Sequence, residues 1–436
     1  MGALPGAAPR HGMPAMTGVA EREGASAAPL RDATEEPAPG HSTGHRLNGL
    51  DGYRAMAVLV VVLYHFKVPH LGGGWIGPEL FFVLSGYLIT TLLIDRFASA
   101  TRPTLLASFW VRRIKRLYPA LLFLIAALIA TVAVLAALGV TTAQRLDPSS
   151  VTSESWSVLG YYANWHLITE HVGYFGQSTS LLKHTWSLAI EEQFYLIFPL
   201  LFVLIMASKR HWRLCGLLVA IGGAAASIAL TAVEASQGNI NTVYYSTPTN
   251  AYHLLIGVGL AFAVHRWEPS AKLTRWFGPL ALSAVLVIAV FVETASLRSG
   301  EPRLWMFQGG GAVLDLVAAA LLMALVFGSR TTGVSRAFNW APMVWIGSVS
   351  YGIYLWHYPV AVLATSADTH AGRWGLLAIQ IALTLAFTVI SYYLVEVVVR
   401  ETQIAQARIR WLLYGLGMAG AVALLLSAPW ILNHVS

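Results

Sequence analysis

Two ionisable residues, Arg54 and His65, lie inside the apolar stretch LDGYRAMAVLVVVLYHF, residues 50–66. An ionisable side chain in a membrane segment costs at least a few kcal/mol unless it is paired, hydrated or used, so its presence indicates function. On a helix the two residues are separated by a rise of about 16 Å, roughly half of a hydrocarbon core. One residue then marks the entrance to a site and the other its interior. The alternative is an Arg that extends to the headgroups and a His that packs in the core.

Paired acids occur in a second apolar stretch, HTWSLAIEEQFYLIFP, residues 184–199. Two neighbouring carboxylates repel each other and need polar or charged partners when they are taken out of water. On a helix the side chains of Glu191 and Glu192 project about 100° apart, so we expect one of them to face a site and the other to meet a polar partner.

Four basic residues precede a third apolar run, in FWVRRIKRLYP, residues 109–119. They are Arg112, Arg113, Lys115 and Arg116. Taken alone, such a group indicates membrane topology, because basic residues concentrate on the cytoplasmic side of membrane proteins.

The composition predicts that these residues are positioned by membrane-spanning helices. The chain has 436 residues, of which 56% are hydrophobic and only 11% charged, and its mean hydropathy is +0.61. Soluble domains carry about 25% charged residues, so we predict an all-α polytopic membrane protein. The single cysteine, Cys215, excludes a disulfide framework and a thiolate metal cluster, and no metal-binding motif is evident, so no metal is expected. The net charge of +7 lies in short segments between apolar runs, which is typical of topology signals and not of nucleic-acid binding.

The apolar runs predict about eleven spans, and the basic segments orient them. The N-terminus is expected inside and the C-terminus outside, with residues 1–46 as a disordered cytoplasmic tail and 47–436 as the transmembrane domain. Arg54 and the basic group then lie at the cytoplasmic end, whereas His65, Glu79 and the paired acids lie nearer the outer half. The spans are expected to begin near Gly52, Pro78, Leu117, Ser187, Leu214, Asn250, Trp276, Gln308, Ala341, Gly375 and Trp411.

Five ordered motifs between residues 50 and 400 resemble those of the acyltransferase-3 family of integral membrane O-acyltransferases. They are the Arg-x10-His pair of Arg54 and His65, the acid-Leu-Phe-Phe motif at Glu79, the Arg-x-x-Arg pair of Arg113 and Arg116, the Trp-Ser-Leu and Glu-Glu-Gln-Phe-Tyr motif, and the late motif SYGIYLWHYP with His357. The closing segment departs from the family, because the Pro usually found after its Glu is absent after Glu396.

The resemblance implies an enzyme that moves an acyl group, expected to be acetyl, from cytoplasmic acyl-coenzyme A to a hydroxyl of a sugar in a surface polysaccharide, glycolipid or glycosylated metabolite. Arg54, Arg112, Arg113 and Arg116 would bind the phosphates of the donor, since guanidinium groups suit phosphates. His65 would act as general base or carry the acyl group itself, with Glu79 as its orienting carboxylate. Glu191 and Glu192 complete the catalytic set, and Trp186, Tyr195 and His357 are the candidates for acceptor binding.

Other interpretations of these residues stay open. Glu79 can be an interfacial carboxylate in water, and His357 can pack between helices without touching an acceptor. A secondary transporter or flippase for a glycolipid or small acid would also place charges within the membrane, although no internal repeat is evident. In either case the chain is expected in the inner membrane of a bacterium.

Overall fold

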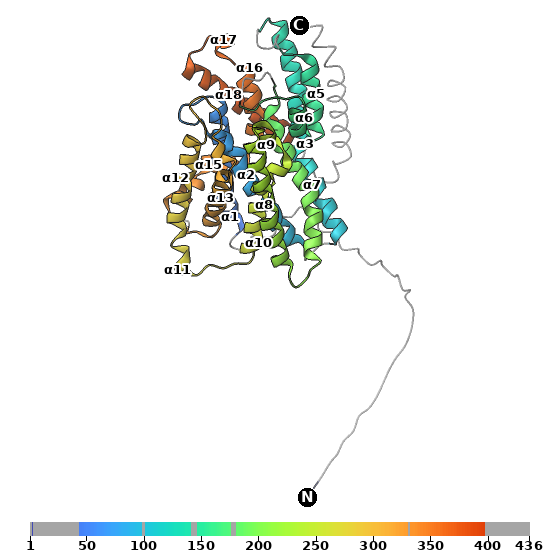
Figure 1. The fold of residues 1–436 in the computed structure, drawn as a ribbon, viewed down its shortest axis with the longest axis vertical. Helices are drawn as coiled ribbons and strands as arrows, with labels where there is room; N and C mark the ends of the chain where they lie inside the picture. Colours follow the sequence, from blue (N-terminus) through green and yellow to red (C-terminus); the bar gives the residue numbers. More distant parts are fainter. Residues whose placement is uncertain are drawn as a thin grey trace, which may run out of the picture. The chain divides into compact units, whose positions relative to one another are not determined.

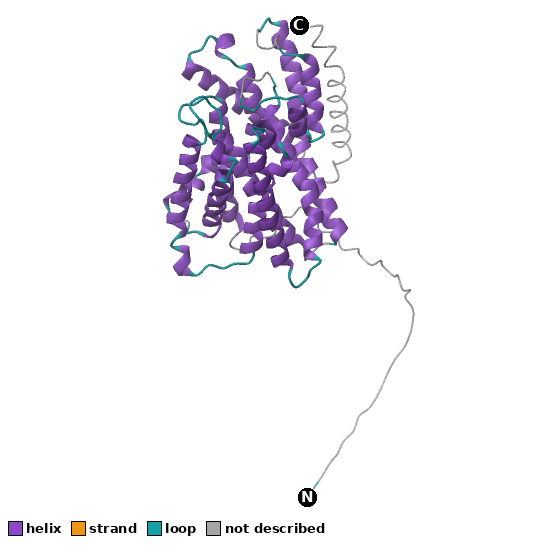
Figure 2. Ribbon diagram, viewed as in Figure 1, coloured by secondary structure: helices purple, strands orange, loops and turns teal. Residues whose placement is uncertain are grey.

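The computed structural model describes residues 2, 43–97, 101–140, 146–175, 180–329 and 332–396. In these ranges the regular structure is helical, with no β-strand and one isolated bridge between Ser296 and Pro302 (Figure 2). The predicted all-α class is therefore confirmed. The predicted tail, 1–46, and the predicted span from Trp411 lie largely or wholly outside the described residues.

Long helices run side by side through the bundle, and shorter helices and turns join them (Figure 1). The long helices are α1 (Thr43–His65), α2 (Gly77–Phe97), α3 (Arg102–Ala137), α7 (Trp186–Met206), α8 (Trp212–Ser236), α10 (Thr247–Val264), α12 (Phe277–Thr294), α13 (Gly310–Phe327), α16 (Ser350–Leu363) and α18 (Arg373–Ser391). The short helices are α5 (Pro148–Leu159), α6 (Ala163–Thr169), α9 (Ile240–Tyr245), α11 (Ala271–Thr274), α14 (Gly333–Phe338), α15 (Ala341–Ser348) and α17 (Ser366–Thr369). Single 3₁₀ turns cover Gly74–Ile76, Lys183–Thr185 and Leu304–Met306, and a π-helical turn, Tyr392–Glu396, follows α18.

Seven helical stretches in the described part of the chain are long and apolar enough to cross a membrane. Three more predicted spans coincide with helices that are polar in part or interrupted, namely α1, α10 and the pair α15 and α16, which is broken at Val349. The predicted count of about eleven is thus not confirmed, and the orientation of the termini stays a prediction.

Helix α3 begins fifteen residues before the predicted span at Leu117. The basic segment 109–119 is therefore part of one continuous helix and not a loop before it. Arg113 and Arg116 are one turn apart, so their side chains lie on the same face of α3.

Helices α2 and α10 touch through their backbones. A Cβ atom added to Gly257 would lie 2.0 Å from the carbonyl oxygen of Val83, and one added to Gly86 would lie 2.0 Å from that of Leu254. Only glycine permits this approach, because small residues let membrane helices pack closely. The contact fixes which faces of α2 and α10 meet.

Buried aromatic rings join the starts of α2 and α7 to the segment that follows α6. Trp75 and Trp186 are 0% and 1% exposed, and both lie against Tyr244. The ring of Tyr174 packs 4.2 Å from that of Tyr244, between the centroids. The segment between α6 and α7 therefore packs inward through Tyr174, next to His65 at the end of α1.

Candidate active site

A cavity of about 820 Å³ opens among α1, α2, α3, α7 and α16. Along α2 its lining extends from Pro78 to Leu88, which is a rise of about 15 Å on a helix. Its polar lining combines the arginines and the paired acids that the sequence marked as chemically unusual, and it includes no histidine among the described residues. These polar residues are Arg54, Ser85, Arg113, Arg116, Ser187, Glu191, Glu192, Tyr195, Ser350, Tyr351 and Tyr354.

The arginines reach the cavity from two helices. Arg54 on α1 pairs with Asp51, one turn earlier. The guanidinium of Arg113 lies over the ring of Tyr195, with its central carbon 4.2 Å from the ring centroid, which is a cation–π contact. Arg116 is exposed within the cavity, whereas Arg112 is exposed but is not part of the lining. Three of the four predicted donor-binding residues thus share one cavity.

Both paired acids face this cavity, contrary to the expectation that only one would do so. A carboxylate oxygen of Glu191 accepts short hydrogen bonds from the hydroxyls of Ser85 and Tyr195. Glu192 also belongs to the lining. The separation into an inner basic site and an outer acidic site was therefore wrong for these two residues. Hydropathy gives an approximate depth along a helix, and it does not show which side chains of α3 and α7 meet.

His65, at the end of α1, forms a pair with His357 of α16 that the sequence did not predict. Nδ1 of His357 lies 2.6 Å from the carbonyl oxygen of Tyr354, and its Nε2 lies 3.1 Å from Nδ1 of His65. A carbonyl oxygen only accepts, so Nδ1 of His357 carries the proton and, in the neutral ring, Nε2 is the acceptor. Nδ1 of His65 must then donate to it. This makes Nε2 the unprotonated, accepting nitrogen of His65, as a general base requires.

The basic nitrogen of His65 is surrounded by aromatic residues. Its Nε2 lies 3.4 Å from the hydroxyl oxygen of Tyr174, and the ring of Tyr358 packs edge-on at 4.9 Å between centroids. His184 is also buried here, against His357 and Tyr358, and its nitrogens have no side-chain partner in the described part of the chain. Sequence reasoning missed His184 and the pairing of Tyr174. The one available signal was the place of His184 at the start of the 184–199 motif.

Hydrogen bonds connect the cavity wall to the histidines. The hydroxyl of Tyr354 donates to the carbonyl oxygen of His184 at 2.6 Å, so the hydroxyl of Ser187 must be the donor in its 2.7 Å contact with Tyr354. Ser187 and Tyr354 line the cavity, and the carbonyl of Tyr354 is also the group that fixes the ring of His357. Two residues of the cavity lining are thus linked directly to the histidine cluster.

Glu79 does not orient His65 in this structure. It is 5% exposed and groups with His253 of α10 and Asp315 of α13, and no hydrogen bond joins it to the described atoms of His65. The direction in which α2 presents this residue cannot be read from its place in a motif. Trp186, a predicted acceptor-binding residue, is buried in the aromatic core described above and is not part of the cavity lining.

Glu154 of α5, outside the candidate spans, holds the segment that carries His184. Its carboxylate accepts a hydrogen bond from the backbone nitrogen of Leu182 at 3.3 Å. Burial raises the pKa of Glu154 to about 7, because the charged form loses its hydration. The connection between α5 and the histidine cluster is therefore sensitive to pH near neutrality.

A helical membrane protein with arginines, carboxylates and paired histidines around one cavity belongs to the class of membrane enzymes or transporters that handle a ligand within the bilayer. The comparison with known families decides between these two. Residues 47–396 match the family described as an acyltransferase domain, and the chain belongs to this acyltransferase-3 family. The chain is a multi-pass bacterial membrane protein of this family.

Relatives in three bacteria align with most of the chain. A protein of Bacillus subtilis named putative peptidoglycan O-acetyltransferase YrhL is 32% identical over 373 residues, which cover 83% of this chain and 56% of the relative. The O-acetyltransferase OatA of Staphylococcus aureus is 32% identical over 367 residues, 81% of this chain and 57% of the relative, and the peptidoglycan O-acetyltransferase OatA of Listeria monocytogenes is 32% identical over 367 residues, 81% and 55%. The chain thus spans little more than half the length of these relatives. No solved structure matches it.

Proposed function

We propose that the chain transfers an acetyl group from acetyl-coenzyme A, bound from the cytoplasmic side, to a hydroxyl of a cell-wall polysaccharide such as peptidoglycan. The observation that carries the proposal is the cavity itself. It is lined by three arginines and by Tyr354, and the backbone of Tyr354 holds His357, the hydrogen-bonded partner that sets the basic nitrogen of His65. The names of the relatives supply the acetyl group and the acceptor.

Arg54, Arg113 and Arg116 would bind the phosphates of the donor. Guanidinium groups make charge-assisted, often bidentate hydrogen bonds to phosphate, and three of them can match the pyrophosphate and 3′-phosphate of coenzyme A. The cavity rises about 15 Å along α2, which gives the pantetheine arm room to bring the thioester toward His65.

His65 would remove the proton from the acceptor hydroxyl through Nε2. The hydroxyl oxygen then attacks the thioester carbonyl, and the departing thiolate takes up the proton that His65 has received. His357 assists by accepting from Nδ1 of His65, which holds the ring in place and stabilises its charged form during the transfer. This is the role that the sequence had assigned to Glu79.

The test uses the full chain purified in detergent, with acetyl-coenzyme A and a soluble glycan acceptor, and product detection by mass spectrometry. We expect His65→Ala and His65→Gln to lose transfer by about 10²- to 10⁴-fold while keeping donor affinity, since Gln fills similar space but does not take the proton. A transporter would show no acetylated product in any variant. Near-normal turnover by His65→Gln would contradict the assignment of the base.

Donor binding is tested separately by calorimetry with acetyl-coenzyme A. Arg113→Ala and Arg116→Ala should each weaken binding by about tenfold or more, because a lost charge-assisted contact costs on the order of 1.5–3 kcal/mol. The matched control is Lys115→Ala, a basic residue on the same turn of α3 that is exposed and not part of the cavity lining. Equal affinities in all three variants would make the basic group a topology signal only.

A further inference from the structure

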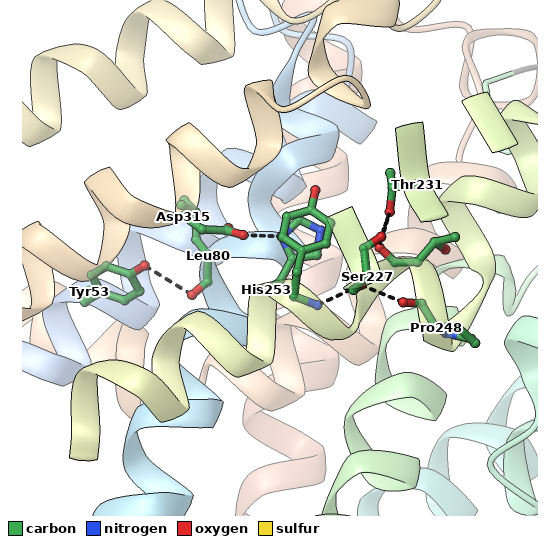
Figure 3. Close-up of polar contacts among 9 residues, drawn as sticks. Tyr53, Leu80, Ser227, Thr231, Pro248, His253 and Asp315 are labelled. Carbon is green, nitrogen blue, oxygen red and sulfur yellow. Dashed lines mark hydrogen bonds and ion pairs between the residues drawn. The ribbon is translucent and has the colours of Figure 1, made fainter. Parts of the chain in front are cut away.

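Three buried ionisable residues meet on the side of α2 that faces α10 and α13. They are Glu79, His253 and Asp315, with exposed fractions of 5%, 2% and 0%. One ligand atom from each lies within 4.8 Å of the other two. Nδ1 of His253 is 2.7 Å from a carboxylate oxygen of Asp315. Figure 3 draws this contact as a dashed line. The proposed transfer reaction uses none of the three.

The group has polar atoms that nothing in the described structure satisfies. Oε2 of Glu79 and Oδ1 of Asp315 are buried and have no hydrogen-bond partner there. Buried carboxylate oxygens without partners are costly, and two carboxylates beside one imidazole leave excess negative charge in a medium of low dielectric. A divalent cation would cancel this charge and occupy the unpaired oxygens at the same time.

We propose that Glu79, His253 and Asp315 form a binding site for a divalent transition-metal ion of the Zn²⁺ or Mn²⁺ type. One imidazole nitrogen and two carboxylates suit these ions, whereas Mg²⁺ and Ca²⁺ prefer oxygen ligands throughout. Ligand atoms around such an ion stand roughly 3–4 Å apart, so the observed spacing needs only small side-chain adjustments. The sequence alone gave no reason to expect a metal, because the three proposed ligands lie on helices that are far apart in the sequence.

Space and polar groups for a metal-bound water adjoin the ligands. A cavity of about 250 Å³ touches Glu79 and His253, and Thr231, Asn250 and Tyr252 contribute to its lining. A site with three protein ligands and water in the remaining position is a common arrangement for Zn²⁺. The surrounding backbone is fixed, since Ser227 of α8 accepts from the backbone nitrogen of Tyr252 and donates to the carbonyl of Pro248 (Figure 3).

The ion would hold the start of α2 against α10 and α13. His253 lies one turn before Gly257, where the two backbones touch, and Glu79 lies two turns before Gly86 on α2. Phe82, on the turn after Glu79, contacts the ring of His253 and also lines the large cavity. Binding is thus expected to stabilise the wall of the active-site cavity without contacting the donor.

The test uses the purified full chain in detergent, treated with a chelator, freed of it and titrated with ZnCl₂, MnCl₂ or MgCl₂. We expect about one equivalent of Zn²⁺ or Mn²⁺ per chain by mass spectrometry of the metal, and a higher melting temperature, because a ligand that binds only the folded state stabilises it. Mg²⁺ should give a smaller shift in melting temperature. Wild-type protein that holds no stoichiometric Zn²⁺ or Mn²⁺ after titration would overturn the proposal and leave a shared proton as the means of charge balance.

Two variants and one control locate the ion. His253→Gln and Asp315→Asn should lower the affinity for the ion by tenfold or more and lose the thermal shift. The control is His70→Gln, which removes an exposed histidine that also pairs with a carboxylate, that of Glu293, at 3.4 Å. Wild-type behaviour is expected of the control. Unchanged ion affinity in both site variants, or equal loss in the control, would overturn the assignment. Should a variant fail to run as a single species in gel filtration, the wild-type titration still decides.

Discussion

At the scale of single residues, the tautomer of His65 depends on an acceptor supplied by His357. A glutamine at position 357 retains an oxygen that can accept from Nδ1 of His65, whereas an alanine does not. We therefore expect His357→Gln to keep more activity than His357→Ala, which should lose on the order of 10- to 100-fold in kcat as part of the general-base contribution disappears. KM for acetyl-coenzyme A should change little in both. The measurement is steady-state kinetics with the purified protein.

A purely structural role for His357 predicts another result. Loss of packing would lower the melting temperature of His357→Ala and raise KM together with the fall in kcat. Equal kcat values for the Gln and Ala variants would contradict the orienting role.

Glu154 gives a prediction for the dependence of stability on pH. Its pKa is raised by burial to about 7, above the usual value for a carboxyl group, so the folded state holds this proton more tightly than the unfolded state. The resulting stabilisation is complete below the unfolded pKa and is lost as pH rises through about 7. The free energy of unfolding of Glu154→Gln should therefore exceed that of wild type at pH 8 by on the order of 1–3 kcal/mol. The variant should accordingly melt at a higher temperature. The difference should shrink as pH falls to 5.

The matching control is Glu170→Gln, since Glu170 is an exposed carboxylate in the same region of the chain. It should follow wild type at every pH. The measurement is thermal unfolding of the three proteins in one detergent at pH values from 5 to 8. A difference in melting temperature between Glu154→Gln and wild type that does not change with pH would contradict the titration of Glu154.

The sequence made single unusual residues evident, but it did not show which residues they contact. Arg54 and His65 were evident because each carries a large cost in an apolar run. The contact between His65 and His357 joins residues 292 positions apart. Such a contact depends on how α1 and α16 pack, and neither spacing nor composition contains that information. For the same reason Glu79 was assigned to the wrong partner.

At the scale of helices, the contact between α2 and α10 positions both cavities, and two glycines of α10 test it. A Cβ at Gly257 would lie 2.0 Å from a backbone oxygen of α2, whereas a Cβ at Gly259 would have its nearest neighbour at 3.5 Å, the Cβ of Ala220. Overpacking usually costs about 1–3 kcal/mol. Gly257→Ala should therefore lower the melting temperature and the activity, and Gly259→Ala should leave both close to wild type. Equal melting temperatures would show that the two helices can move apart at no cost.

For the basic segment 109–119, the sequence alone did not show which basic side chains face the cavity. Its four basic residues suggested a cytoplasmic flank, and the motif suggested a phosphate site. Because α3 is continuous from Arg102, Arg113 and Arg116 share a face that lines the cavity, and Arg112 does not. The two arginines of the motif are the two of this segment that line the cavity, and the helix explains why their spacing is three.

At the scale of the whole molecule, the apolar runs predicted most of the long helices well. The beginnings of α2, α7, α8 and α12 lie within two residues of the predicted positions. The errors fall where a span is polar or broken: α1 begins by Thr43, before the predicted Gly52, and the predicted span from Ala341 is divided into α15 and α16. Internal cavities lined by charged residues lower the hydropathy of the helices around them, so the functional part of a membrane protein is where such counts fail.

The orientation in the membrane is the last prediction, and the two ends of α8 test it. Lys209 and Arg210 precede α8 and Arg213 lies in its first turn, whereas residues 235–249, from the end of α8 onward, contain no Lys or Arg. Basic residues remain in the cytoplasm, so a reporter fused after Arg210 should read as cytoplasmic and one fused after Gln237 as external. A fusion after Ser436 should also read as external if the number of spans is odd. Both α8 fusions on the same side would exclude α8 as a span. A reversed pair would place Arg113 and Arg116 on the outer side and separate them from a cytoplasmic donor.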